Sequence, residues 1–209
     1  MECAVEGASG VVLAGGQSRR MGRPKALLPF ATGTLLEWVV RRVRLVCAEV
    51  VVVAREGVVS PGLTVVTDRF ADAGPLAGLH AGLLAVHGED CLVVACDLPF
   101  VQPPLLQLLR EQLAGWDAVV PLVAGHPEPL CAAYRRAVAL PAEALLREGG
   151  GSLRELLARL QVCFLGEDVL RAADPELVSF FNLNTPADYQ LALQRLAAEA
   201  DHESRSSPL

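Results

Sequence analysis

Residues 10–16 read Gly-Val-Val-Leu-Ala-Gly-Gly, an apolar run that ends in two adjacent glycines. The β-branched residues of the run favour a strand, and the paired glycines allow a tight turn because they carry no Cβ. Exposed amide groups in such a turn form a concavity that binds anions. Basic residues with no acid among them follow the turn, at Arg19, Arg20, Arg23 and Lys25. The segment therefore predicts a buried strand followed by a phosphate-binding loop.

The spacing of this loop differs from the two most familiar phosphate loops. It has neither the closing Gly-Lys-Ser/Thr of a P-loop nor the Gly-x-Gly-x-x-Gly of a dinucleotide-binding turn. From its residues alone, a surface turn with a solvated basic cluster explains the segment about as well as a phosphate site does.

Further apolar runs alternate with helical patterns along the rest of the chain. The continuous run 50–53 is typical of a strand covered on both faces. The other expected strands are 63–66, 91–95, 118–120, 130–134 and 161–165. The expected helices are 34–47, 75–87, 104–113 and 137–147, a short one after Ser152, and a last one with Thr185 as N-cap and Pro186 at its first position. This alternation predicts an α/β fold with three α/β/α layers and a Rossmann-like, mostly parallel sheet.

Composition excludes several classes of protein. The chain has 209 residues, 52% of them hydrophobic, which predicts a single domain over residues 1–200 and a polar, disordered tail over 201–209. A net charge of −6 argues against nucleic-acid binding. No apolar stretch approaches the ~20 residues of a membrane span, and the N-terminus has acids where a signal peptide is basic. We therefore expect a cytoplasmic protein that contacts no membrane.

Three polar features follow predicted strands. They are the glycine loop, Asp68, and Asp97, which follows the apolar run that ends at Cys96. Ligands of α/β sheets bind beyond the carboxyl ends of the strands, so these features are expected to meet on one rim. The simpler alternative is that both aspartates are turn or helix caps. Cys91 and Cys96 are five apart, which places them on opposite faces of a strand and disfavours a shared metal.

Five segments in this order resemble one family of nucleotidyltransferases. They are the Leu-Ala-Gly-Gly-x-Ser-x-Arg-Met-Gly loop at 13–22 with Pro-Lys-Ala-Leu-Leu at 24–28, Asp68 with Gly-Pro-Leu-Ala-Gly at 74–78, Cys-Asp-Leu-Pro-Phe at 96–100, Glu-Pro-Leu-Cys-Ala-Ala-Tyr at 128–134, and Asn-Leu-Asn-Thr-Pro-Ala-Asp at 182–188. They are most similar to the molybdenum cofactor guanylyltransferases and cover most of residues 11–190. The second glycine of the loop favours guanine over cytosine.

The resemblance implies a nucleotidyltransferase-type sheet and transfer of GMP from GTP to the terminal phosphate of molybdenum-molybdopterin, with Mg²⁺ and release of pyrophosphate. It implies that the N-terminal half binds GTP and the C-terminal half molybdopterin. The implied binding residues are Leu13, Ala14, Gly15, Gly16, Lys25, Asp68, Gly74, Gly78, Asp97, Asn182 and Asn184. The implied catalytic residues are Arg20, Lys25 and Asp97, with Asp97 also as the metal ligand. Transient contacts with molybdenum-insertion proteins and molybdoenzyme chaperones are expected.

Two residues depart from the family pattern. Arg55 follows Ala54 where the family has an asparagine, and Glu128 stands where it has a glutamine. Other functions therefore stay open: a cytidylyltransferase that uses CTP with the same acceptor, a sugar-phosphate nucleotidyltransferase, or a nucleotide-sensing module without catalysis. For Asn182 and Asn184, bracing the last helix is an alternative to binding the pterin.

Overall fold

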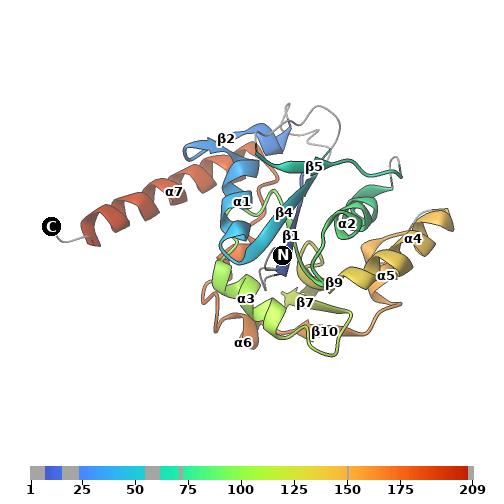
Figure 1. The fold of residues 1–209 in the computed structure, drawn as a ribbon. Coiled ribbons are helices and arrows are strands. Elements are labelled where there is room, and N and C mark those ends of the chain that lie inside the picture. Colours follow the sequence, from blue (N-terminus) through green and yellow to red (C-terminus); the bar gives the residue numbers. More distant parts are fainter. Residues whose placement is uncertain (1–7, 16–23, 55–61, 71–72, 150, 207–209) are drawn as a thin grey trace, which may run out of the picture.

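The computed structural model describes residues 8–15, 24–54, 62–70, 73–149 and 151–206, with side chains up to residue 198. Its centre is a sheet in the order β10-β7-β9-β6-β1-β4-β5, with β8 paired to β7 (Figure 1). The strands are β1 (Ala8–Leu13), β4 (Cys47–Val53), β5 (Thr64–Val66), β6 (Asp90–Ala95), β7 (Ala118–Val123), β8 (His126–Pro127), β9 (Cys131–Arg135) and β10 (Val162–Leu165). A small hairpin joins β2 (Pro29–Phe30) and β3 (Gly33–Thr34).

The sheet is mostly parallel, as the sequence predicts. β1 pairs in parallel with β4 and β6, β4 with β5, and β7 with β10. β9 lies between β6 and β7 and runs antiparallel to both. The apolar pattern at 130–134 predicts a strand but not the direction in which the strand runs. The β2–β3 hairpin and the two-residue strand β8 were also not predicted, because such short pairs leave no periodic pattern.

Helices cover both faces of the sheet. They are α1 (Leu35–Arg44), α2 (Gly74–Ala85), α3 (Pro103–Glu111), α4 (Ala139–Arg147), α5 (Leu153–Leu157), α6 (Glu167–Leu170) and α7 (Pro186–Ser206), with 3₁₀ turns η1 (Lys25–Leu27), η2 (Arg136–Val138) and η3 (Val178–Phe180). In Figure 1, α1, α3 and α6 lie on one side of the strands, and α2, α4 and α5 lie on the other. The predicted three-layer α/β/α architecture is confirmed.

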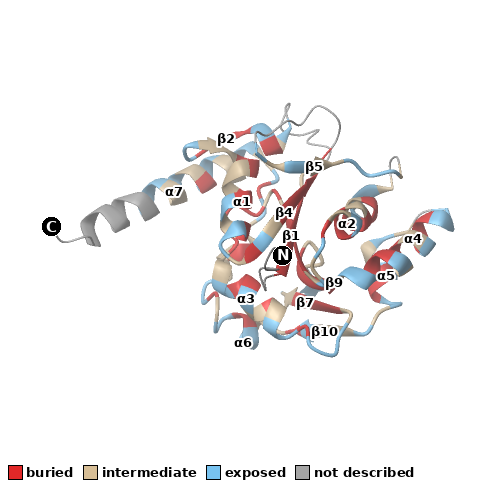
Figure 2. Cartoon of the chain, in the orientation of Figure 1, coloured by how far each residue is buried: buried red, intermediate tan, exposed pale blue. Residues whose placement is uncertain are grey.

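Alternating strand residues enter two separate buried clusters, and the central strands β1 and β4 are largely red in Figure 2. Val52 and Val94 belong to the cluster that contains α1 and α3 residues, and Val51 and Val93 to the cluster that contains α2 and α4 residues. Cys96 joins the first cluster and Cys91 the second, so the expected separation of these thiols is confirmed. This period-2 pattern is what a strand between two helical layers requires.

Helix α2 packs closely against β1 through a glycine. A Cβ on Gly82 would lie 2.3 Å from Val11 Cγ1, closer than side chains can approach, and Val11 itself is fully buried. The absent side chain therefore sets the height of α2 above the sheet. One turn earlier, Gly78 lies beside Leu13, the last residue of β1.

A polar network joins β1, β4 and the end of α2 at the amino edge of the sheet. Ser9 Oγ donates to Glu49 Oε1 at 2.5 Å, and the backbone N–H groups of His87 and Gly88 donate to the same oxygen at 2.6 and 3.2 Å. His87 Nδ1 lies 2.9 Å from Glu49 Oε2. Burial would raise the pKa of Glu49, but these hydrogen bonds outweigh it and lower the pKa to about 2.

The last helix begins as the sequence predicts, with Thr185 before Pro186. Asp188 Oδ2 accepts from Thr185 N at 2.7 Å, while Thr185 Oγ1 accepts from Asp188 N at 3.2 Å. This reciprocal pair caps the helix. α7 packs on the β2–β3 hairpin through Ala192 and through Tyr189, whose hydroxyl donates to Pro29 O at 2.5 Å. The helix continues to Ser206, into the segment assigned to the tail, and extends away from the body (Figure 1).

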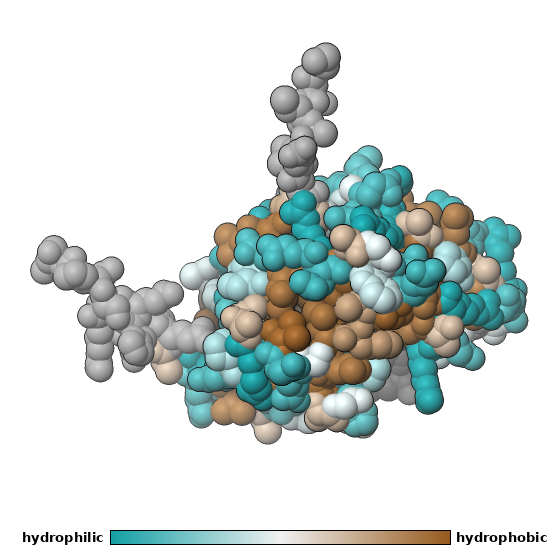
Figure 3. Space-filling model, turned by 90° about the horizontal axis from the view of Figure 1, so that it is seen from below, coloured by the Kyte–Doolittle hydropathy of each residue, from teal (hydrophilic) through white to brown (hydrophobic). Residues whose placement is uncertain are grey.

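Figure 3 shows a face on which apolar side chains gather at the centre, with hydrophilic side chains around them. Among the large apolar side chains left exposed are Phe164 on the edge strand β10 and Val169 on α6. Within the described part of the chain, no helix is long and apolar enough to span a bilayer.

Candidate functional site

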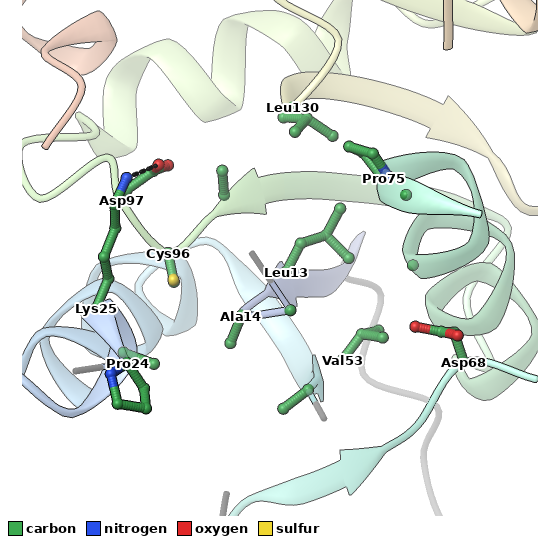
Figure 4. Close-up of a pocket in the computed structure, with 16 residues that line it drawn as sticks. Leu13, Ala14, Pro24, Lys25, Val53, Asp68, Pro75, Cys96, Asp97 and Leu130 are labelled. Carbon is green, nitrogen blue, oxygen red and sulfur yellow. Dashed lines mark hydrogen bonds and ion pairs between the residues drawn. The ribbon is translucent and has the colours of Figure 1, made fainter. Parts of the chain in front are cut away.

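A pocket of about 400 Å³ opens at the carboxyl ends of the central strands (Figure 4). Leu13, Val53 and Ala95, which end β1, β4 and β6, contribute to its wall. The full lining is Leu13, Ala14, Gly15, Pro24, Lys25, Ala26, Val53, Ala54, Asp68, Gly74, Pro75, Gly78, Ala95, Cys96, Asp97 and Leu130. The pocket thus gathers the glycine loop and both aspartates on one rim, as the strand ends predict.

Backbone hydrogen bonds hold the start of the glycine loop in place. Ala14 N donates to Val53 O at 2.7 Å, and Cys96 N donates to Leu13 O at 3.0 Å. A Cβ on Gly15 would meet nothing within 4 Å, so the backbone there borders open space. The predicted residues Gly16 and Arg20, and also Arg55, lie outside the described residues.

One end of the pocket is formed by Asp68 and the first turns of α2. Asp68 is exposed, and Figure 4 shows its carboxylate across the pocket from Asp97 and Lys25. Gly74 starts α2 with φ +68°, a conformation that favours glycine. A Cβ on Gly78 would lie 3.5 Å from Leu13 Cδ2, an ordinary contact, so this helix face borders the pocket without crowding. Among the residues described, no donor bonds the Asp68 carboxylate, which does not support a role as a turn cap.

Lys25, Asp97 and Asn184 meet at the other end. Lys25 Nζ lies 3.1 Å from Asp97 Oδ2 and 2.8 Å from Asn184 Oδ1. The side chains of Lys25 and Asp97 are only 17% and 23% exposed. Leu183 N also donates to Asp97 O at 2.9 Å, which fixes the 182–184 segment beside the end of β6. One side-chain oxygen of Asp97 and one of Asn184 therefore accept hydrogen bonds from the same ammonium group.

The two asparagines differ in their contacts. Both are exposed and flank the buried Leu183, as expected for an extended segment. The Asn184 side chain accepts from Lys25 rather than bracing α7, because Asp188 supplies the cap and also accepts from Asn184 N at 3.0 Å. The hydrogen bond with Thr185 and those from backbone N–H groups lower the pKa of Asp188. Within the described part of the chain, no hydrogen bond of the Asn182 side chain is found.

The pocket contains residues that the sequence analysis did not assign. Val53, Ala95 and Leu130 form apolar wall, and their positions at or beside strand ends are the signal that could have found them. Cys96 is buried, and burial raises the pKa of its thiol to about 12. Glu128 is half-buried. Burial raises the pKa of its carboxyl, the charge of His126 opposes this rise, and the charge of Asp97 adds to it.

Comparisons with known proteins identify the family of the chain. Residues 10–163 match the family described as MobA-like NTP transferase domain. The chain is 39% identical over 200 residues to the "Probable molybdenum cofactor guanylyltransferase" of Pelotomaculum thermopropionicum, covering 95% of this chain and 97% of the relative. It is 34% identical over 192 residues to the molybdenum cofactor guanylyltransferase of Desulfosudis oleivorans, covering 90% and 95%.

Solved structures show the same fold. The molybdopterin-guanine dinucleotide biosynthesis protein A of Archaeoglobus fulgidus superposes with a TM-score of 0.79 at 32% identity, covering 91% of this chain and 99% of that one. The 2-C-methyl-D-erythritol 4-phosphate cytidylyltransferase of Thermus thermophilus superposes with a TM-score of 0.69 at 23% identity, covering 90% and 98%. The second likeness concerns the fold alone.

Proposed function

Because the chain belongs to the family of MobA-like NTP transferases, we propose that it transfers GMP from GTP to the terminal phosphate of molybdenum-molybdopterin, forming the molybdopterin guanine dinucleotide cofactor and releasing pyrophosphate. It is a nucleotidyltransferase. The observation that carries the proposal is the pocket itself, with the start of the glycine loop in its lining, a carboxylate at one end, and a lysine, an aspartate and an asparagine at the other.

The base is proposed to bind at the Asp68 end. A carboxylate accepts hydrogen bonds only, and the Watson–Crick edge of guanine offers N–H donors. Gly74 and Gly78 leave room for a flat ring against the first turns of α2, because neither has a side chain. Leu13, Ala14, Gly15 and Gly16 would then lie along the nucleotide. In this assignment, the N-terminal half of the domain binds GTP.

The phosphates are proposed to bind between the glycine loop and Lys25. The lysine ammonium is a compact charge that can follow a phosphate, and Arg20 adds a planar fork of donors. Both would neutralise charge on the triphosphate and on the departing pyrophosphate. Such a reaction needs no covalent bond to the protein, so these side chains act by positioning and by charge stabilisation.

Asp97 is proposed as the Mg²⁺ ligand, with Asn184 beside it. The fit is supported by their oxygens, which already share one cation, the ammonium of Lys25, at 3.1 and 2.8 Å. Mg²⁺ takes one or two carboxylates and completes its shell with phosphate oxygens and water. When bound, it would polarise the phosphate oxygens and orient the leaving group.

The acceptor is proposed to enter on the side of the C-terminal half, where Asn182 and Asn184 offer amide donors and acceptors to a polar pterin. A cofactor that is handed between proteins also implies transient contacts with molybdenum-insertion proteins and with molybdoenzyme chaperones. We place this reaction in the cytoplasm.

The test is to incubate the pure protein with MgGTP and molybdenum-loaded molybdopterin and to identify the nucleotide product. GMP attached to the pterin phosphate and one pyrophosphate per turnover are expected. CTP and a sugar phosphate replace GTP and the acceptor in parallel reactions. Preferred use of CTP would establish the cytidylyltransferase instead, and the absence of pyrophosphate release with every pair would overturn the proposal.

A further inference from the structure

Glu128 and Asp97 lie close to the last hydrogen bond that joins β9 to β6. These strands are antiparallel, with Val94 paired to Cys131. Beyond the last pair, Ala95 N still donates to Leu130 O at 2.7 Å. Asp97 and Glu128 each lie two residues from this bond, in turns closed by the bonds from Leu98 N to Ala95 O and from Cys131 N to Glu128 O. The charge of Asp97 acts on the Glu128 carboxyl, which agrees with this nearness.

The backbone at Glu128 is fixed on both sides. Its N–H donates to Pro121 O at 2.9 Å, and its carbonyl accepts from Cys131 N at 3.1 Å. The next carbonyl, that of Pro129, accepts from the hydroxyl of the fully buried Tyr134 at 2.8 Å. The side chain of Glu128 is therefore presented from a rigid turn, as a preorganised ligand requires.

The surroundings of Glu128 leave its carboxylate available. The side chain is half-buried, and within the described residues only burial and the charges of His126 and Asp97 act on it, with no hydrogen bond to it. Leu130, two residues on, lines the pocket together with Asp97 (Figure 4). The charges of Asp97 and Glu128 repel each other, and Lys25, whose Nζ lies 3.1 Å from Asp97 Oδ2, offsets part of that repulsion. A divalent cation shared by both carboxylates would offset it further.

We propose that Glu128 is a second carboxylate of the cation site and holds the divalent metal together with Asp97. The inference rests on the proposed function, which supplies Asp97 as the first ligand. It adds a residue whose charge tunes how strongly the metal binds. The set of two carboxylates, one amide and the nucleotide phosphates matches the oxygen ligands that Mg²⁺ and Mn²⁺ take.

The test measures how far a metal strengthens nucleotide binding. Calorimetry gives the Kd of a GTP analogue with an α,β-methylene bridge, once with excess Mn²⁺ and once with EDTA. The readout is the Kd with EDTA divided by the Kd with Mn²⁺, which is large when the metal strengthens binding. It is measured for the unchanged protein, Glu128→Gln, Asp97→Asn and the control Glu111→Gln, which alters an exposed carboxylate at the end of α3. Circular dichroism and the Tm verify that each variant is folded.

We expect Glu128→Gln to lower the ratio about tenfold, the scale on which ligand and supporting groups change metal affinity, while Glu111→Gln leaves it unchanged. If Glu128→Gln leaves the ratio unchanged while Asp97→Asn lowers it to about one, the role of Glu128 is overturned and the proposed function stays intact. An unchanged ratio in Asp97→Asn would overturn the metal site itself.

Discussion

The substitutions Gly78→Ala and Gly82→Ala should have different effects on nucleotide binding and on the free energy of unfolding, although both residues lie on α2. Alanine is about 1 kcal/mol more favourable than glycine inside a helix. At Gly78 the added Cβ makes only an ordinary 3.5 Å contact with Leu13 Cδ2, so this gain should be kept in part. We therefore expect Gly78→Ala to raise the free energy of unfolding by about 0.5–1 kcal/mol.

At Gly82 the same methyl group would lie 2.3 Å from Val11 Cγ1 and 3.2 Å from Val53 Cγ2, both on buried strands. Overpacking of this kind costs about 1–3 kcal/mol. An approach of 2.3 Å places the cost in the upper part of that range, about 2–3 kcal/mol. After the gain of about 1 kcal/mol in helix propensity, a net loss of about 1–2 kcal/mol is expected for Gly82→Ala. Urea unfolding of both variants measures these free energies.

The affinity for GTP should be lowered in Gly78→Ala, the variant that is expected to be the more stable of the two. The methyl group of Gly78→Ala enters the pocket where the base is proposed to lie, so GTP should bind at least about tenfold more weakly, or roughly 1.4 kcal/mol. Calorimetry with MgGTP measures this change. A Gly78→Ala protein that is stable and binds GTP unchanged would refute the placement of the base. A Gly82→Ala protein as stable as the original would refute the close packing of α2 on β1.

Three further outcomes are expected. Asp97→Asn should fold but lose at least about 100-fold in turnover, roughly 2.7 kcal/mol, and a pyrophosphate-release assay that finds most activity retained would remove Asp97 from the mechanism. Lys25→Glu should weaken GTP binding sharply, and more at low than at high ionic strength; an affinity that is unchanged and insensitive to salt would contradict its phosphate role. Glu49→Gln should cost about 1–2 kcal/mol at pH 7. The pKa of Glu49 is lowered on folding to about 2, so its contribution is complete above about pH 4.5 and declines as the pH falls towards 2; urea unfolding that gives the same difference at pH 7 and pH 3 would argue against this network.

Much of the architecture could be predicted because local patterns determine it. Continuous valine runs such as 50–53 are typical of a strand covered on both faces, and Thr185 followed by Pro186 is typical of a helix start. The direction of β9 could not be predicted in this way. A strand has the same alternation of side chains in both directions, and its direction is decided by the connection through β8.

The site was predictable in part for a similar reason. Asp68 and Asp97 follow strands, and strand ends of a parallel sheet share one edge, so their common pocket follows from topology. The contact between Lys25 and Asn184 spans 159 positions and depends on how α7 packs against the hairpin, which no local pattern contains. The nearness of Glu128 to Asp97 depends likewise on the antiparallel pairing of β9 with β6.

The long span of the Lys25–Asn184 contact also bears on how the protein is made. A ribosome releases the N-terminal part of a chain first, and a domain generally folds as a unit. The strands β1, β4 and β6 that wall the nucleotide pocket end by Ala95, yet Lys25 can meet Asn184 only after the segment that joins Leu183 to Asp97 has been synthesised. A chain therefore has the whole site only once it has been translated past residue 184.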